Sequence, residues 1–138
     1  MLGNMSNRTV FLSRYVGLFE LIVAVAMFAH QSDFVEAVTA LLRDRPLLFL
    51  ASVITVAVGL ALVLAHNRWS DGAPALVVTL IGWMTLIKGV LLLLLPPAAA
   101  LTLFVSELHY ERFYYFYAAL ALALGIYLTA AGFRAASR

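Results

Sequence analysis

Apolar residues fill four long stretches of the chain, and the short segments between them hold most of the charged residues. The stretches run from about Val10 to His30, Leu47 to Ala65, Ala73 to Leu95 and Phe113 to Phe133. A helix needs about 20 mostly apolar residues to cross a bilayer, and each stretch is long enough. The stretches are rich in Leu and Ala and lack the period-two alternation of membrane strands. The pattern predicts an all-α membrane protein, with four transmembrane helices in a bundle that forms a single domain over residues 1–138.

The two outer connections predict short amphipathic helices that lie in the membrane interface. In the first, Asp33 followed by Glu36 resembles a capping box at a helix start, and Pro46 marks the end. In the second, Pro97 suits a first helical turn. Apolar residues share one face of each helix: Phe34, Val38, Leu41 and Leu42 in the first, Leu101, Phe104, Val105 and Leu108 in the second. These helices either cover the ends of the spans or form a lid over a central site.

Composition narrows the class of protein further. The chain has 138 residues, of which 64% are hydrophobic and 12% charged, and its mean hydropathy is +1.00. A soluble domain is nearer half apolar and a quarter charged, so this composition excludes a soluble globular domain, a disordered chain and a typical nucleic-acid binder. The absence of cysteine excludes a disulfide scaffold. The chain lacks the sequence fingerprints of hydrolases, kinases and dinucleotide-binding proteins. Neither His30 nor His109 belongs to a local metal-binding motif such as H-x-x-E-H. We therefore expect no enzyme activity, no cofactor and no metal.

Arginines indicate the orientation in the membrane, because Lys and Arg favour the cytoplasmic side. With four spans, both termini and the middle loop share one side, which carries five arginines against three on the other. We predict that both termini lie in the cytoplasm. Glu20 interrupts the first apolar stretch, which favours an uncleaved helix over a signal peptide. The five arginines on the predicted cytoplasmic side are Arg8, Arg14, Arg68, Arg134 and Arg138, and the three on the opposite side are Arg43, Arg45 and Arg112.

The chain shows a tandem two-helix repeat, over residues 10–68 and 73–134. A shift of 65 positions carries the small residues of the first span onto those of the third, and a shift of 66 carries the second onto the fourth. Such halves would be related by a pseudo-twofold axis along the membrane normal. Small residues let membrane helices approach closely, so the stripes predict packing faces toward the bundle centre or, alternatively, an oligomer contact. The glycines of these stripes are Gly17, Gly59, Gly82, Gly89 and Gly125.

Two charged residues lie deep within the spans. Glu20 is near the middle of the first and Lys88 is somewhat beyond the middle of the third. An intramembrane charge costs a few kcal/mol and normally faces the protein interior and a partner. We predict that Glu20 and Lys88 form an intramembrane polar site, with a direct ion pair as the favoured contact. The pair could fix the helix register, or the site could bind an ion or relay protons. Alternatively, Lys88 snorkels to the outer interface and leaves Glu20 protonated.

Polar and aromatic residues close the second span at the predicted cytoplasmic face. His66 lies on the small-residue stripe, and Asn67 and Trp69 follow it. Trp83 lies deeper, in the third span, where an indole N–H usually needs an acceptor. We predict that these four residues form the inner mouth of the polar site, with a structural turn as the alternative. The aromatic run from 113 to 117 is typical of a membrane-interface belt, and a wall for a flat apolar ligand such as a quinone is the other reading.

The segment His66-Asn67-Arg68-Trp69, followed by the helix from Gly82 to Gly89, resembles a bacterial family. The family consists of small four-helix integral membrane proteins of uncharacterised function, with an H-N-x-W loop and a G-W-x-x-L-x-K-G helix. The resemblance covers about a quarter of the chain. It implies an inner-membrane protein in which the His66 loop and Lys88 have a role beyond packing.

Three functions fit these features. The first is a channel or transporter for a small solute or ion, acting as a homo-oligomer, with Glu20 and Lys88 as its site. The second is a non-catalytic subunit or assembly factor of a larger membrane complex, in which the two charges only set the helix register. The third is a lipid- or quinone-binding protein that uses the aromatic start of the fourth span. In all three the partners are the bilayer and a membrane protein or second copy, not nucleic acid.

Overall fold

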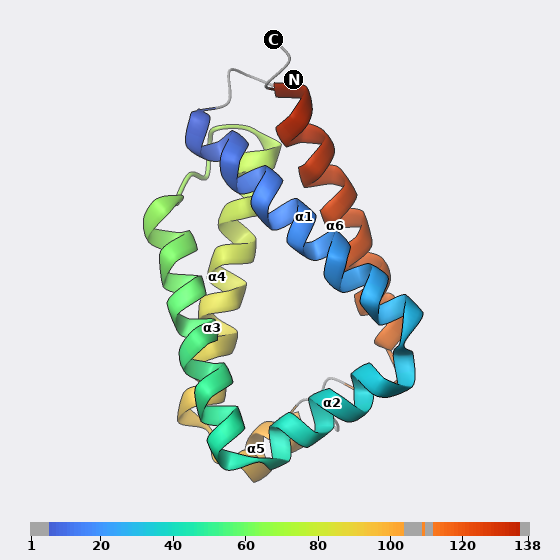
Figure 1. Cartoon of the computed structure of the whole chain (residues 1–138). Coiled ribbons are helices and arrows are strands. Elements are labelled where there is room, and N and C mark those ends of the chain that lie inside the picture. The colour runs from blue at the N-terminus through green and yellow to red at the C-terminus, as the bar shows by residue number, and fades with distance from the viewer. Residues whose placement is uncertain (1–5, 104–108, 110–111, 136–138) are drawn as a thin grey trace.

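The computed structural model describes residues 6–103, 109 and 112–135, and these residues form six helices (Figure 1). Four of the helices are long and apolar enough to cross a membrane, which confirms an integral membrane protein. Each observed end lies within three residues of its predicted position. The helices are α1 (Asn7–Ala29), α2 (Gln31–Arg43), α3 (Arg45–Ala65), α4 (Ala73–Leu94), α5 (Pro97–Leu101) and α6 (Tyr114–Arg134).

Local sequence explains where the helices begin. Ser6 caps α1, since its hydroxyl accepts the N–H of Thr9 at 3.3 Å. Asp44 caps α3 in the same way, with its Oδ1 2.9 Å from the N of Leu47. Prolines occupy the first turns of α3, α4 and α5, where a missing N–H costs no hydrogen bond. The predicted cap at Asp33 is wrong, because α2 starts at Gln31 and Asp33 lies in its first turn.

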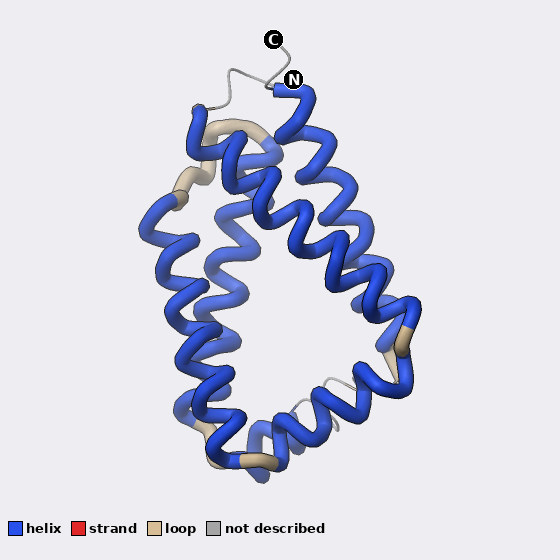
Figure 2. The backbone as a smooth tube through the Cα atoms, in the orientation of Figure 1, coloured by secondary structure: helices blue, strands red, loops and turns tan. Residues whose placement is uncertain are grey.

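The long helices pack as two antiparallel pairs, α1 with α6 and α3 with α4 (Figures 1 and 2). Glycines make both contacts close. A Cβ on Gly59 would lie 2.5 Å from the backbone of Leu86, and one on Gly125 would lie 2.8 Å from the backbone N of Leu21. The bundle with all small residues facing one centre is therefore not confirmed, because the glycines lie between the two helices of each pair.

The two pairs use equivalent contacts. Gly17 faces Leu128 and Thr129 across the first pair, and Gly82 faces Leu62 and Val63 across the second. The glycines are 65 positions apart, and their contact partners are 66 apart, as in the predicted repeat. Gly125 against Leu21 and Gly59 against Leu86 match in the same way. Each pair takes one helix from residues 10–68 and one from 73–134, so the pairs are built across the two halves.

Apolar clusters hold the molecule together at three corners (Figure 1). At the end near the chain termini, all four long helices meet in one cluster. At the opposite end, one cluster joins α2, α3, α4 and α5, and another joins α1 and α6 with α2 packed against them. The buried members are Leu12, Val16, Leu62, Val78 and Leu128 at the first corner, Leu42, Leu48, Leu92 and Ala100 at the second, and Met27, Tyr114 and Ala118 at the third.

The helix pairs meet at one end and diverge toward the other, where α2 and α5 bridge them (Figure 2). The helical state predicted for the outer connections is seen over α2 and α5, while residues 104–108 of the second connection lie outside the described residues. The diverging pairs leave an opening in the middle of the molecule.

Candidate functional site

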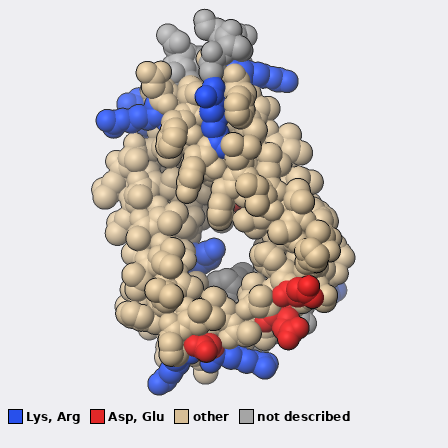
Figure 3. Space-filling model, viewed as in Figure 1, with Lys and Arg blue, Asp and Glu red and all other residues tan. Residues whose placement is uncertain are grey.

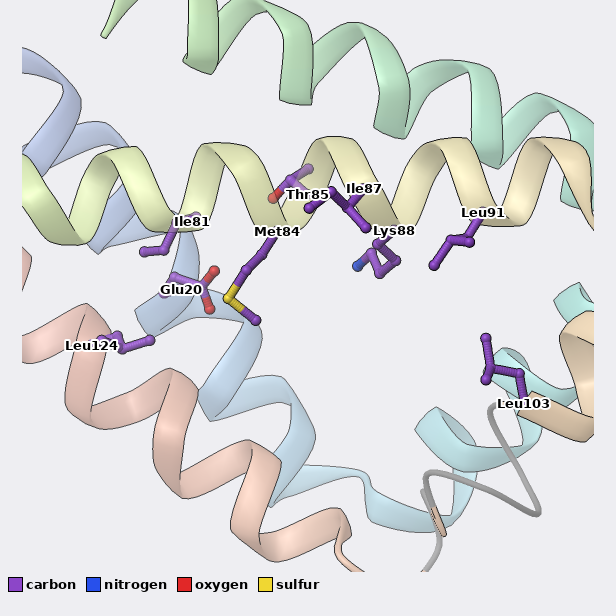
Figure 4. A pocket seen from close by; sticks show the side chains of 9 residues that line it. All are labelled: Glu20, Ile81, Met84, Thr85, Ile87, Lys88, Leu91, Leu103 and Leu124. Atoms are coloured by element: carbon purple, nitrogen blue, oxygen red, sulfur yellow. The ribbon is translucent and has the colours of Figure 1, made fainter. Parts of the chain in front are cut away.

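The opening between the pairs contains a cavity of about 440 Å³. Its polar lining consists of Glu20 from α1 and Thr85 and Lys88 from α4. Figure 4 shows the Glu20 carboxylate and the Lys88 ammonium pointing into this space from their two helices. The remaining lining is apolar and comes from α4, α6 and the segment after α5, namely Ile81, Met84, Ile87, Leu91, Leu103 and Leu124.

A second cavity, of about 360 Å³, lies between α1, α3 and α4. It shares four lining residues with the first: Glu20, Ile81, Thr85 and Lys88. The two cavities therefore meet at the charged residues, and together they form a passage between the helix pairs. Figure 3 shows the opening on one face of the molecule, with a basic group inside it.

Glu20 and Lys88 lie at similar depth. Each is about 20 Å along its helix from the end near the termini, at a rise of about 1.5 Å per residue. The predicted direct ion pair is not formed, because the ion pairs within 4.0 Å among the described residues are His30 with Asp33 and Arg68 with Asp71. Both charges instead face shared space. Sequence reasoning found both residues but not the gap between them, because the gap depends on how far the helix pairs diverge.

Thr85 is the polar residue of the cavity lining that the sequence did not single out as a site residue. The shift of 65 positions that relates the first span to the third carries Glu20 onto Thr85. In the structure both residues line both cavities, so equivalent positions of the two halves face each other across the opening. Repeat symmetry is therefore the signal that could have placed Thr85 in the site.

Three of the residues predicted for the inner mouth, His66, Asn67 and Trp69, lie at the turn between α3 and α4, and Trp83 lies within α4. Asn67 Oδ1 accepts the indole N–H of Trp69 at 2.8 Å and that of Trp83 at 3.3 Å. Trp83 thus has the acceptor that its depth required. None of the four is among the residues that line the two cavities in the described part of the chain. The geometry gives Asn67, Trp69 and Trp83 a role in holding the turn.

His66 is buried where α3 ends. Its side chain is 1% exposed, and neither ring nitrogen has a hydrogen-bond partner, although the backbone of Ala75 lies near the ring. Burial, with a smaller contribution from the Arg68 charge, lowers the pKa of His66. The hydroxyl of Thr79 holds the turn around it, since it accepts the N–H of Arg68 at 3.1 Å and lies 3.3 Å from the His66 carbonyl.

The aromatic start of α6 joins three helices. Tyr114 is fully buried and donates its hydroxyl proton to the carbonyl of Met27 at 2.8 Å. Its ring packs edge-on against Phe34 of α2, and Tyr115 donates to Gln31 at 2.6 Å. These contacts use the first aromatic residues of α6 to lock the corner between α1, α2 and α6, and this leaves less of the run to face a flat ligand.

The chain has no significant match to a protein-family model, to a curated protein or to a solved structure. Its described residues contain no group of three or more His, Cys, Asp or Glu side chains that could hold a metal. The candidate site therefore rests on the geometry of the central cavity.

Proposed function

We propose that this protein is a small transporter whose solute binds in the central cavity, midway across a bacterial inner membrane. The observation that supports the proposal is that two charges of opposite sign line one intramembrane cavity and interact across it without a direct ion pair. Two opposite charges held apart are costly at this depth, so we expect water, an ion or a polar group to lie between them. Glu20 and Lys88 are then the contacts that the solute makes.

A transporter fits the cavity better than an open channel does. Packed corners close both ends of the opening, the first where the four long helices meet and the others where α2 and α5 bridge the pairs. A channel needs an open path between the two aqueous sides, whereas a transporter needs a central site that opens to each side in turn. On this proposal α2 and α5 lie in the outer interface and cover the site from that side.

The linkage between the helix pairs suggests how the site opens. The chain passes from one pair to the other through α2 and through the connection that contains α5, and both helices lie at the outer end (Figure 1). At the opposite end the pairs are joined only by side-chain packing at the first corner, within the described residues. Each pair is held by close glycine contacts and can move as a unit. We therefore place the hinge at the outer end and the gate at the cytoplasmic end.

The orientation follows from charge. Among the described residues, arginines 8, 14, 68 and 134 lie at the end where the chain starts and finishes, and acidic side chains gather at the α2 end (Figure 3). Arg43, Arg45 and Arg112 belong to the other side, so the positive-inside rule favours termini in the cytoplasm by four described arginines against three. The cavity lies within one chain, so transport does not require the predicted homo-oligomer, which remains a prediction.

Cysteine labelling tests whether the cavity is reached from water, since the chain has no cysteine of its own. Thr85→Cys should react, in reconstituted vesicles, with a charged methanethiosulfonate that does not cross membranes. Mass spectrometry would measure the modified fraction. Ile22→Cys is the control, because Ile22 lies at the depth of Glu20 but is 69% exposed on the outer surface of α1. We expect Thr85→Cys to be modified and Ile22→Cys to stay unmodified.

The rates at which anionic and cationic reagents modify Thr85→Cys test whether Glu20 and Lys88 act in the cavity. Lys88→Met should slow modification of Thr85→Cys by an anionic reagent more than by a cationic one, and Glu20→Gln should have the opposite selectivity. Glu36→Gln, an exposed change on α2, should alter neither rate. If Thr85→Cys is no more reactive than Ile22→Cys, the cavity has no aqueous access. The transporter proposal then fails, and a non-catalytic subunit of a membrane complex becomes the better explanation.

A further inference from the structure

We infer that the ligand of the central cavity is a zwitterionic amphiphile, with its cationic group at Glu20, its anionic group at Lys88 and its apolar body along α4. The inference rests on the proposed function in using the same cavity, and it adds the chemical class of the ligand. It follows from three features of the cavity: the signs of its charges, its apolar lining and the direction in which it opens.

The two charges exclude simpler ligands. A lone inorganic cation at Glu20 would share the cavity with the Lys88 ammonium, and a lone anion at Lys88 would share it with the Glu20 carboxylate. A neutral apolar molecule would keep the two charges apart in a medium of low dielectric constant and give neither of them a direct contact. A ligand that carries one charge of each sign pairs both side chains at once. Such a ligand also adds no net charge to the middle of the membrane.

The lining shows that the ligand has an apolar body. Three of the nine residues that line the larger cavity are polar, and the other six are apolar. Along α4, Ile87 and Leu91 continue the lining away from Glu20 toward Leu103, as Figure 4 shows. The volume of about 440 Å³ lies within the usual range for small-molecule sites, about 300–1,000 Å³. An inorganic ion would use only the charged end of this space.

The openings favour a ligand that arrives from the lipid. The passage runs between the helix pairs, whose outer surfaces carry apolar side chains, while packed clusters close the two ends of the molecule. A lipid-dissolved molecule can enter sideways without opening a corner. We therefore assign the ligand to the membrane phase, as a single-chain lipid or a similar molecule with an amine and an acidic group in its head.

Three single-chain lipids of equal chain length test the charge requirement. One has a phosphoethanolamine head, one a phosphoglycerol head with the anion only, and one is an alkylamine with the cation only. Binding to the full chain in a neutral detergent would be measured by native mass spectrometry and by the shift in Tm. We expect the zwitterion to bind at least about tenfold more tightly than either other lipid, since a charged contact is typically worth this factor or more.

Two variants should change this preference in opposite directions. Glu20→Gln should make the zwitterionic and anionic lipids bind equally, because the amine has lost its partner. Lys88→Met should make the zwitterionic and cationic lipids bind equally. Glu36→Gln is the matched control and should keep the wild-type preference, since Glu36 is exposed on α2. Misfolding alone would weaken all three lipids together, so it cannot produce this crossed pattern.

Equal binding of the three lipids to the wild-type protein would overturn the inference, as would a uniform loss of all three in both variants. Free phenylalanine, a water-soluble zwitterion, serves as a competitor. If phenylalanine fails to displace the phosphoethanolamine lipid, a ligand from the membrane is supported. If it displaces the lipid, the assignment of the ligand to the membrane phase is overturned. Lipid preference without labelling of Thr85→Cys would refute transport but keep the ligand class. Labelling of Thr85→Cys without lipid preference would keep transport and refute the ligand class.

Discussion

His66 is a titratable side chain enclosed at the turn between α3 and α4, with no hydrogen-bond partner for either ring nitrogen. Burial is the largest cause that lowers its pKa, the Arg68 charge adds to it, and the Ala75 backbone and Asp71 act in the opposite direction. The folded protein therefore holds His66 neutral at a pH at which the unfolded chain, with a pKa of about 6.5, begins to bind a proton. Protonation of His66 accordingly favours unfolding.

Stability should therefore fall as the pH drops. We expect Tm in detergent to be nearly constant above about pH 6.5 and to decrease between that pH and the lower pKa of folded His66, because the unfolded state takes up the proton first. The change in fluorescence of Trp69 and Trp83 would report Tm. His66→Phe should flatten the curve, whereas His30→Gln, a change at an exposed residue, should leave it intact. A wild-type curve that stays level down to pH 5 would refute this account.

At the scale of elements, the glycine contacts decide which helices pair. Gly59→Ala would place a methyl group 2.5 Å from the Leu86 backbone, which cannot move aside without shifting α4. Gly82→Ala meets the Cβ of Leu62 at 3.0 Å instead, and this smaller overlap needs only a slight shift of α3. Overpacking of this kind typically costs about 1–3 kcal/mol. We expect Gly59→Ala to lower the free energy of unfolding by about this amount and Gly82→Ala by clearly less.

Unfolding by SDS titration in mixed micelles would compare these two variants with Ala61→Val, an exposed change on α3. Equal effects of Gly59→Ala and Ala61→Val would show that the close α3–α4 contact does not form. A larger effect for Gly82→Ala than for Gly59→Ala would mean that the contact is shifted along the helices.

The sequence predicted single helices well and their arrangement poorly. Apolar length and caps such as Asp44 are local, so the ends of the spans could be placed within three residues. The choice of partner is not local. A face with Gly17 and Ala24 fits any helix with a similar face, and only the structure shows that its partner carries Gly125. The distance between Glu20 and Lys88 is harder still to predict from the sequence, because it depends on how α2 and α5 hold the pairs apart.

At the scale of the whole molecule, the pairing gives the cavity its position. Each pair combines one helix from each half of the chain, so the equivalent residues Glu20 and Thr85 come to lie on opposite sides of the opening. A pairing of each span with its neighbour within one half would have put all close contacts inside the halves.

This arrangement predicts the behaviour of a divided chain. A break between Asp71 and Gly72, in the exposed turn before α4, separates both glycine-packed pairs into different fragments. Each fragment then has two long helices without their partners. Their exposed small-residue faces should associate, because such faces let membrane helices pack closely. We expect co-expressed fragments to copurify one to one, and each fragment alone to aggregate or be degraded. Gly59→Leu should weaken copurification, with α1 and α6 still joining the fragments, and Ala61→Leu should preserve it, because Gly59 faces α4 closely and Ala61 is exposed. A fragment that is monodisperse alone and ignores its partner would mean that contacts within a half, rather than across the halves, hold the protein together.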